Sequence, residues 1–159
     1  MNMEIQAALD LADETDSFLQ LTDVVYDKET EVGYDSLTEL EKTIFCIDGL
    51  LREMENGGFA QFFRQEAGAY SDDTVDALER IKAKESAALL RKMLNYFSEG
   101  KAPPDEDDRL DAFNQIEDEH ADDISALDDR FYDADENLVG LTLLYVQKNL
   151  KTARQNFQP

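Results

Sequence analysis

The spacing of apolar residues is the feature that most restricts how this chain can fold. Leucine, isoleucine, phenylalanine and methionine recur three and four residues apart over long stretches, and the only prolines are Pro103, Pro104 and Pro159. This spacing is the period of an amphipathic α-helix, and stretches without proline allow helices to continue. A chain of 159 residues with 42% hydrophobic residues can fill one core. We therefore expect an all-α fold, a compact single-domain multi-helix bundle formed by residues 1–159.

The clearest helix boundaries surround a predicted central helix. Ser36-Leu37-Thr38-Glu39 fits a capping box, so we expect this helix to begin at Ser36 and to end at Asn56-Gly57-Gly58. Its apolar residues form a wide stripe, which is typical of a helix that is buried on most sides. Further helices are predicted over residues 59–66, 71–81, 84–97, 105–129 and 136–156. One or two short helices are predicted over residues 4–28, where residues 24–26 form a strand in an alternative interpretation.

Negative charge is concentrated in two parts of the chain. The total is 37 acidic and 15 basic residues, a net charge of −22. Residues 1–35 hold ten acids and one lysine (−9), and residues 36–104 hold twelve acids and nine bases (−3). Residues 105–136 hold fifteen acids and two arginines (−13), and residues 137–159 hold three bases (+3). The total charge disfavours direct binding to nucleic acid or to an anionic membrane, and it favours a basic protein partner.

The segment 105–136 is expected to carry its carboxylates on one solvent-exposed side of a helix. Seven residues fall on a single stripe, so the acids between them should face outward: Leu110, Phe113, Ile116, His120, Ile124, Leu127 and Phe131. Thirty-two helical residues span ~48 Å, which gives one carboxylate per ~3.2 Å. One DNA strand carries one phosphate per ~3.4 Å. A break of the helix near Ala121 would weaken this match, and a simple solvated face explains the same charge run.

Patterns that resemble catalytic or metal sites are incomplete. Glu117-x-x-His120 is half of a di-iron motif, but the chain has no second histidine. The segment 133–144 begins like an EF-hand loop and lacks its glycine and its final glutamate. We expect Cys46 to be buried with a raised pKa, which makes it a poor nucleophile. The sequence therefore predicts no enzymatic activity, no metal and no cofactor.

Three further expectations concern structure and location. His120 should pack into the core, and Lys148, Lys151 and Arg154 should stabilise their helix end and pair with the acidic helix. The longest nearly apolar run, residues 138–146, is too short to cross a bilayer. The N-terminal residues do not resemble a secretory signal, and a single cysteine fits a reducing compartment. We therefore expect a cytoplasmic protein without membrane association.

The segment from Asn56 to Phe63 is the most distinctive motif of the chain. Asn56-Gly57-Gly58 is explained by a sharp turn between helices, since these residues tolerate left-handed backbone angles. Phe59, Phe62 and Phe63 are expected in the core or in a subunit contact, and Gln61 is expected to bond to the backbone of the turn. With residues 37–97 around it, the motif Asn-Gly-Gly-Phe-x-Gln-aromatic-aromatic resembles a bacterial domain family, largely of unknown function, that includes the DMP-type DNA mimic. A weaker similarity follows at residues 127–132.

The resemblance implies an all-helical homodimer and, for one branch of the family, an acidic surface that occupies the DNA site of a transcriptional regulator. We therefore hypothesise that this protein binds a basic DNA-binding protein and competes with DNA. The alternatives are an immunity or inhibitor protein that neutralises a basic toxin or nuclease, and an acid-adapted housekeeping domain. Mimicry requires the two acidic regions to form one continuous band. The candidate phosphate-mimicking residues are Asp10, Asp13, Glu14, Asp16, Asp23, Asp27, Asp105, Glu106, Asp107, Asp108, Asp111, Glu117, Asp118, Glu119, Asp122, Asp123, Asp128 and Asp129.

Overall fold

A computed structural model describes the backbone of residues 2–156 and the side chains of residues 3–151. Within this part of the chain every regular element is helical, which confirms the all-α prediction. The α-helices are α1 (Asn2–Leu9), α2 (Glu14–Val32), α3 (Glu39–Arg64), α4 (Ser71–Arg80), α5 (Lys84–Leu94), α6 (Glu106–Asp133) and α7 (Leu138–Asn156). Short 3₁₀ turns are η1 (Tyr34–Ser36), η2 (Glu66–Tyr70) and η3 (Ser98–Gly100). Residues 24–26 lie within α2, so the alternative strand is wrong.

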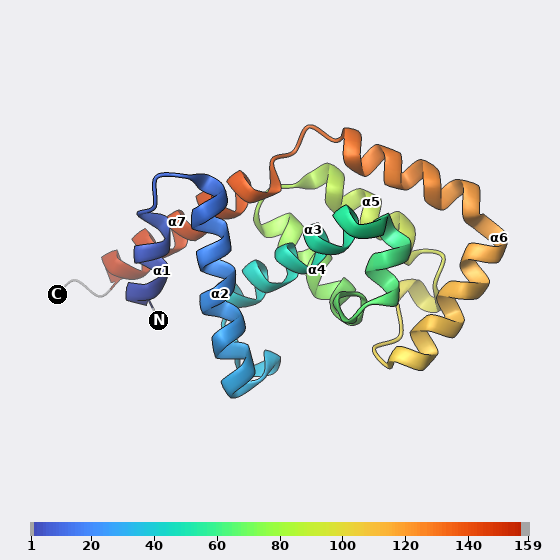
Figure 1. Ribbon diagram of the computed structural model, residues 1–159, viewed down its shortest axis with the longest axis horizontal. Helices are drawn as coiled ribbons and strands as arrows, with labels where there is room; N and C mark the ends of the chain where they lie inside the picture. The colour runs from blue at the N-terminus through green and yellow to red at the C-terminus, as the bar shows by residue number, and fades with distance from the viewer. Residues whose placement is uncertain (1, 157–159) are drawn as a thin grey trace.

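Helix α3 is the centre of the molecule, as its wide apolar stripe predicts. It contacts α2, α4, α6, α7 and η2. The main core gathers buried side chains of α3, α4, α5 and α6. A smaller core lies between α1, α2, α7 and the start of α3. Figure 1 shows α1 and α2 at one end of the long axis, while α6 wraps around the other end.

The capping box of α3 lies two residues later than the sequence predicts. Residues 34–36 form the turn η1 and Leu37 is extended, so the helix begins only after Thr38. The Thr38 hydroxyl accepts a hydrogen bond from the Glu41 amide (3.2 Å), and Glu41 Oε1 accepts one from the Thr38 amide (2.8 Å). The box that forms is therefore Thr38-x-x-Glu41, and the prediction for Ser36 and Glu39 is wrong.

Glu41 combines this cap with a buried ion pair. Its side chain is buried and accepts from Lys28 Nζ of α2 at 2.7 and 3.0 Å. Burial raises the pKa of Glu41, but the hydrogen bonds from Lys28 and Thr38 outweigh burial and hold this pKa below its usual value of 4.5. Glu41 thus stabilises the folded state above its ordinary pKa, and this contribution is lost as the pH falls through the lower, folded-state pKa.

Replacing Glu41 with Gln is expected to lower the free energy of unfolding at pH 7 by about 1–3 kcal/mol, because Lys28 loses its charged acceptor. The difference from wild type should shrink as the pH falls below 4.5, where Glu41 becomes protonated first in the unfolded state, and should vanish only below its lower, folded-state pKa. Urea denaturation at a series of pH values measures this. A difference that stays constant down to pH 3 would contradict the assignment.

The motif Asn56-Gly57-Gly58 produces the expected sharp turn. Gly58 has a φ of +75° and a ψ of −160°, and it separates two helical halves of α3 that run to Asn56 and from Phe59. The side chains of Phe59, Phe62 and Phe63 on the second half are fully buried, which confirms their predicted place in the core. The turn therefore lets one nearly continuous helix change direction inside the bundle.

Helix α7 closes the smaller core. Asn137 Oδ1 accepts a hydrogen bond from the Gly140 amide at 3.0 Å at the start of this helix. The helix packs on α2, α3 and α1, and its end lies beside α1, far from the bend of α6 (Figure 1). The predicted pairing of Lys148, Lys151 and Arg154 with the acidic helix is therefore not supported, and the side chain of Arg154 lies outside the described residues.

Candidate functional site

The acidic segment forms helix α6, and most of its carboxylates face outward, as the sequence predicts. Phe113, Ile116, Ile124 and Leu127 are buried against the main core, which turns the residues between them toward solvent. Asp105 caps the helix through a hydrogen bond from the Asp108 amide (3.0 Å). We call the exposed acids of this helix the α6 acidic face. Its members are Asp105, Glu106, Asp107, Asp108, Asp111, Asp118, Glu119, Asp122, Asp123, Asp129 and Asp133.

Two predicted members of this surface are engaged in the protein's own structure. Glu117 is half-buried and binds Arg64 Nη2 at 2.6 Å. Asp128 is half-buried and accepts a hydrogen bond from the Phe59 amide at 2.9 Å. Burial raises the pKa of Asp128, although the Phe59 hydrogen bond opposes this shift. Asp128 therefore caps the second half of α3, and the prediction that it faces solvent is wrong.

The bases of the same helix do little to neutralise the face. Arg109 is only 1% exposed, and its guanidinium donates to the backbone carbonyls of Phe63, Pro103, Pro104 and Gln65 at 2.9–3.2 Å. Burial lowers the pKa of this guanidinium, but the charge stays because an arginine is not deprotonated in proteins. Arg130 is the exposed base of α6. The helix therefore presents its negative charge largely uncompensated.

The α6 acidic face is bent. His120 leaves helical geometry, with a φ of −134° and a ψ of 27°, and Figure 1 shows α6 turning sharply at the end of the molecule. Its imidazole is half-exposed, packs against the ring of Tyr96 (centroids 4.6 Å apart) and lies 3.5 Å from Asp123. The prediction of a core histidine is therefore wrong. The charge spacing of one straight 48 Å helix does not hold, because the acids lie on two arms of about 20 Å each.

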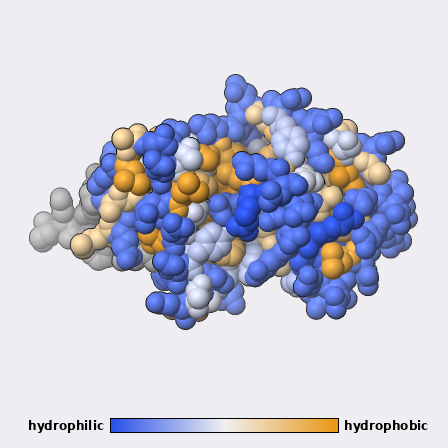
Figure 2. Space-filling view, in the orientation of Figure 1, coloured by the Kyte–Doolittle hydropathy of each residue, from blue (hydrophilic) through white to orange (hydrophobic). Residues whose placement is uncertain are grey.

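The N-terminal acids do not extend this surface. The six predicted residues of the N-terminal region are all exposed: Asp10, Asp13, Glu14, Asp16, Asp23 and Asp27. They lie on α2 and on the loop between α1 and α2, at the end of the long axis opposite the bend of α6 (Figure 1). Figure 2 shows apolar patches over α1 and α2, whereas the visible surface over α6 is mostly hydrophilic. The expected single anionic band is therefore wrong, and the structure has two separate acidic surfaces.

The two sequence motifs that resemble the family lie against each other. Asp128 binds the Phe59 amide, the rings of Phe59 and Phe131 pack edge to face with centroids 5.9 Å apart, and the Tyr132 hydroxyl donates to the Met54 carbonyl. The segment 127–132 of α6 thus holds the turn at 56–58 from outside. These contacts give the residues of both motifs a structural role, and this role is enough to account for them.

Gln61 also stabilises the turn, but in a way that differs from the prediction. Its Nε2 donates to Glu53 Oε2 at 3.0 Å, so it connects the two halves of α3 through side chains and not through the backbone. Asn56 and Gly57 are exposed beside it.

A protein-family model covers most of this chain. The model of the DMP19-like protein family matches residues 35–149. The chain belongs to the DMP19-like protein family. Neither a curated protein nor a solved structure matches it. The DMP19-like match includes α3 to α6 and most of α7, and thus the whole α6 acidic face, whereas α1 and α2 lie outside it.

Two further features of this DMP19-like chain concern the chemistry that the sequence raises, namely the thiol of Cys46 and possible metal ligands. Cys46 is buried as predicted, and burial raises the pKa of its thiol to about 11. Among the residues with described side chains, no group of three or more metal-binding side chains comes together. In the same part of the chain, no helix is both long and apolar enough to span a bilayer.

Proposed function

We propose that this protein is an acidic, DNA-mimic-like regulator whose α6 acidic face binds the basic DNA-binding surface of a transcription factor or another nucleic-acid-binding protein. The observation that supports it is the set of exposed carboxylates on α6 combined with the burial of Arg109. Membership of the DMP19-like family is consistent with this function. The partner's lysines and arginines would bind carboxylates in place of phosphates, so the protein would compete with DNA.

The bend of α6 determines which carboxylates can act together. Asp118 and Glu119 precede His120, and Asp122 and Asp123 follow it, so four exposed acids surround the convex corner. A corner that protrudes from the end of the molecule can enter a concave basic surface that normally receives the DNA backbone. We infer that this corner and the adjoining Asp111 and Asp129 are the centre of the contact.

Competition with DNA is tested by capture and displacement. The protein is immobilised at low salt, bacterial DNA-binding proteins that it retains are identified, and the purified partner is then bound to a labelled DNA duplex. We expect the protein to displace the duplex, with an affinity that falls steeply as salt rises from about 50 to 200 mM, because exposed charges are screened over about 10 Å. Retention of proteins that it cannot displace from DNA would contradict the proposal.

Matched charge variants show which acidic surface is responsible. Asp111→Asn, Asp118→Asn, Asp122→Asn and Asp129→Asn together remove four charges from α6. Asp16→Asn, Asp23→Asn, Asp27→Asn and Glu31→Gln together remove four exposed charges from α2. We expect the α6 set to weaken partner binding at least about tenfold and to flatten its salt dependence, and the α2 set to change affinity less than about threefold. Equal losses would contradict the assignment to α6.

The homodimer that the family resemblance implies is part of this proposal. Two copies would present two α6 corners to the two halves of a symmetric regulator, since closed two-fold dimers are the commonest assemblies. Sedimentation velocity over a range of concentrations measures the oligomeric state. If the protein is a monomer and still displaces DNA, the dimer is not needed for the function, and the proposed contact through α6 stands without it.

A further inference from the structure

A small pocket lies where α2, α3, η2 and α4 meet. Its volume is about 170 Å³. Ligand pockets for drug-sized molecules are typically about 300–1,000 Å³, whereas a cavity of about 150 Å³ holds benzene. The pocket is therefore large enough for one compact chemical group. Its lining residues are Tyr26, Glu29, Phe45, Cys46, Gly49, Arg52, Glu66, Ala67, Tyr70 and Thr74.

Three aromatic rings form the walls. Phe45 lies in the middle, with ring centroids 5.1 Å from Tyr26 and 5.3 Å from Tyr70. The Phe45 and Tyr70 rings are nearly perpendicular, at 86°, so they form a corner. All three side chains are half-buried, and all three line the pocket. Faces of aromatic rings carry negative electrostatic potential and attract cations.

Two carboxylates add negative charge to this corner. Glu66 is exposed and Glu29 is half-buried, so both lie on the solvent side of the pocket. Tyr70 lines the same pocket, and burial together with the negative charges of Glu66 and Glu29 raises the pKa of its hydroxyl. The aromatic walls and the acidic opening thus both favour a positively charged ligand.

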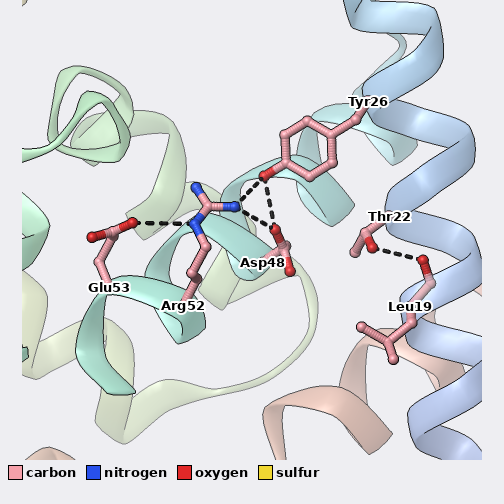
Figure 3. A network of polar contacts seen from close by, with 6 residues as sticks. All are labelled: Leu19, Thr22, Tyr26, Asp48, Arg52 and Glu53. Atoms are coloured by element: carbon pink, nitrogen blue, oxygen red, sulfur yellow. Dashed lines mark hydrogen bonds and ion pairs between the residues drawn. The ribbon is translucent and has the colours of Figure 1, made fainter. Parts of the chain in front are cut away.

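Arg52, the basic residue of the lining, is already bound by the protein itself. Figure 3 shows its guanidinium between Glu53 and the pair formed by Tyr26 and Asp48. Nη1 lies 3.0 Å from Asp48 Oδ2 and 3.1 Å from the Tyr26 hydroxyl, and Nε lies 3.1 Å from Glu53 Oε1. The guanidinium also lies over the Tyr26 ring, 5.9 Å from its centroid. Two carboxylates compensate the one positive charge, so Arg52 leaves the pocket region net negative.

We propose that this pocket binds a small organic ammonium cation, with the rings of Tyr26, Phe45 and Tyr70 as walls and the carboxylates of Glu29 and Glu66 at its opening. A methylated ammonium headgroup fits best, because its bulk matches the volume and its spread-out charge is weakly hydrated. The site is separate from the α6 acidic face, so it does not depend on the proposed function. The headgroup can belong to a free metabolite or to a methylated lysine of a peptide.

Binding of choline to the full-length protein, measured by isothermal titration calorimetry, tests the proposal. The neutral probe is 3,3-dimethylbutan-1-ol, which has the same shape as choline without the charge. We expect saturable choline binding with a Kd of about 1 mM or lower and at least about tenfold weaker binding of the alcohol. A short peptide that carries trimethyllysine shows whether a side chain is preferred to the free cation. Absence of saturable binding of both cations up to about 10 mM, or equal binding of the alcohol, would overturn the proposal.

Variants of the lining locate the site. Phe45→Leu keeps an apolar side chain and removes the ring, so it should weaken choline binding by about 3- to 30-fold. The pair Glu29→Gln and Glu66→Gln should weaken it by a similar factor, whereas the pair Asp72→Asn and Asp76→Asn, which removes two exposed charges of α4 outside the lining, should leave it within about twofold. If the α4 pair weakened choline binding as much as the pair Glu29→Gln and Glu66→Gln does, the proposal would be overturned. The α6 charge set should not change choline affinity, which keeps this test apart from that of partner binding.

Discussion

Replacing Arg109 with Met is expected to lower the free energy of unfolding by about 3–5 kcal/mol. The reason is that its guanidinium is the donor for four backbone carbonyls, those of Phe63, Gln65, Pro103 and Pro104, in the protein interior. Met fills a similar volume without any donor, so these carbonyls lose their hydrogen bonds. Domains are typically stable by about 5–15 kcal/mol, so much of the total would be lost.

The matched control for this variant is Arg130→Met. Arg130 lies on the same helix, is exposed and carries the same charge, so its replacement should change stability by less than about 0.5 kcal/mol. Arg109→Lys should fall between the two, since an ammonium group has three donors and cannot reproduce the planar fork of a guanidinium. Urea denaturation followed by circular dichroism measures all three. Equal stability of the Arg109 and Arg130 variants would show that the buried donor network contributes nothing.

Arg109 also determines how the acidic helix is attached. It connects the end of α3, through Phe63 and Gln65, to the loop at Pro103 and Pro104 that leads into α6. Gly68 lies in the same place, where an added Cβ would be 2.8 Å from the Phe62 carbonyl oxygen and 3.1 Å from Arg109 Nε. The start of the α6 acidic face is therefore fixed by a buried cation and a close backbone contact.

The sequence predicts the helices well because their signals are local. Apolar periodicity depends on neighbours three and four residues away, and the turn at Gly57-Gly58 depends on backbone freedom at one position. The start of α3 was predicted two residues early because Ser36-x-x-Glu39 and Thr38-x-x-Glu41 fit the same capping pattern. Only the turn η1 and the burial of Glu41 against Lys28 decide between them, and both depend on tertiary packing.

The candidate site is less predictable because it depends on contacts between distant segments. In the sequence Arg109 is one of two bases among fifteen acids, and nothing local indicates that it is buried. Asp128 belongs to the same charge run, yet it caps a helix segment 69 residues away. His120 lies on the apolar stripe, yet it marks the bend that divides the acidic helix. The aromatic pocket was also missed, since Tyr26 and Phe45 meet only when α2 packs on α3. The local signals were the spacing of Tyr26 and Glu29 on α2 and that of Phe45, Gly49 and Arg52 on α3.

Replacing Gly58 with Ala is expected to lower the free energy of unfolding by at least about 2 kcal/mol. Its φ of +75° with a ψ of −160° is a conformation that only glycine adopts readily, and an added Cβ would lie 2.6–2.8 Å from the carboxylate atoms of Asp128. Gly57→Ala is the matched control. The φ of Gly57 is 173°, which any residue adopts, and the nearest atom to an added Cβ is Gln61 Cβ at 2.9 Å, so a smaller loss is expected.

A double-mutant cycle separates the backbone strain at Gly58 from its collision with Asp128. Asp128→Ala alone removes the cap on the Phe59 amide and should cost about 0.5–2 kcal/mol. Combined with Gly58→Ala, it also removes the atoms that the new methyl group would strike, so the double variant should be more stable than the sum of the two single losses by about 0.5–3 kcal/mol. Additive losses would mean that the collision is relieved by a small shift of α6 and that strain at φ +75° accounts for the whole effect. A measurable coupling would instead show that Gly58 of the family motif and Asp128 of the 127–132 segment form one structural unit. Neutralising Asp128 in a test of mimicry would then disrupt the turn, and the result would not report on partner binding.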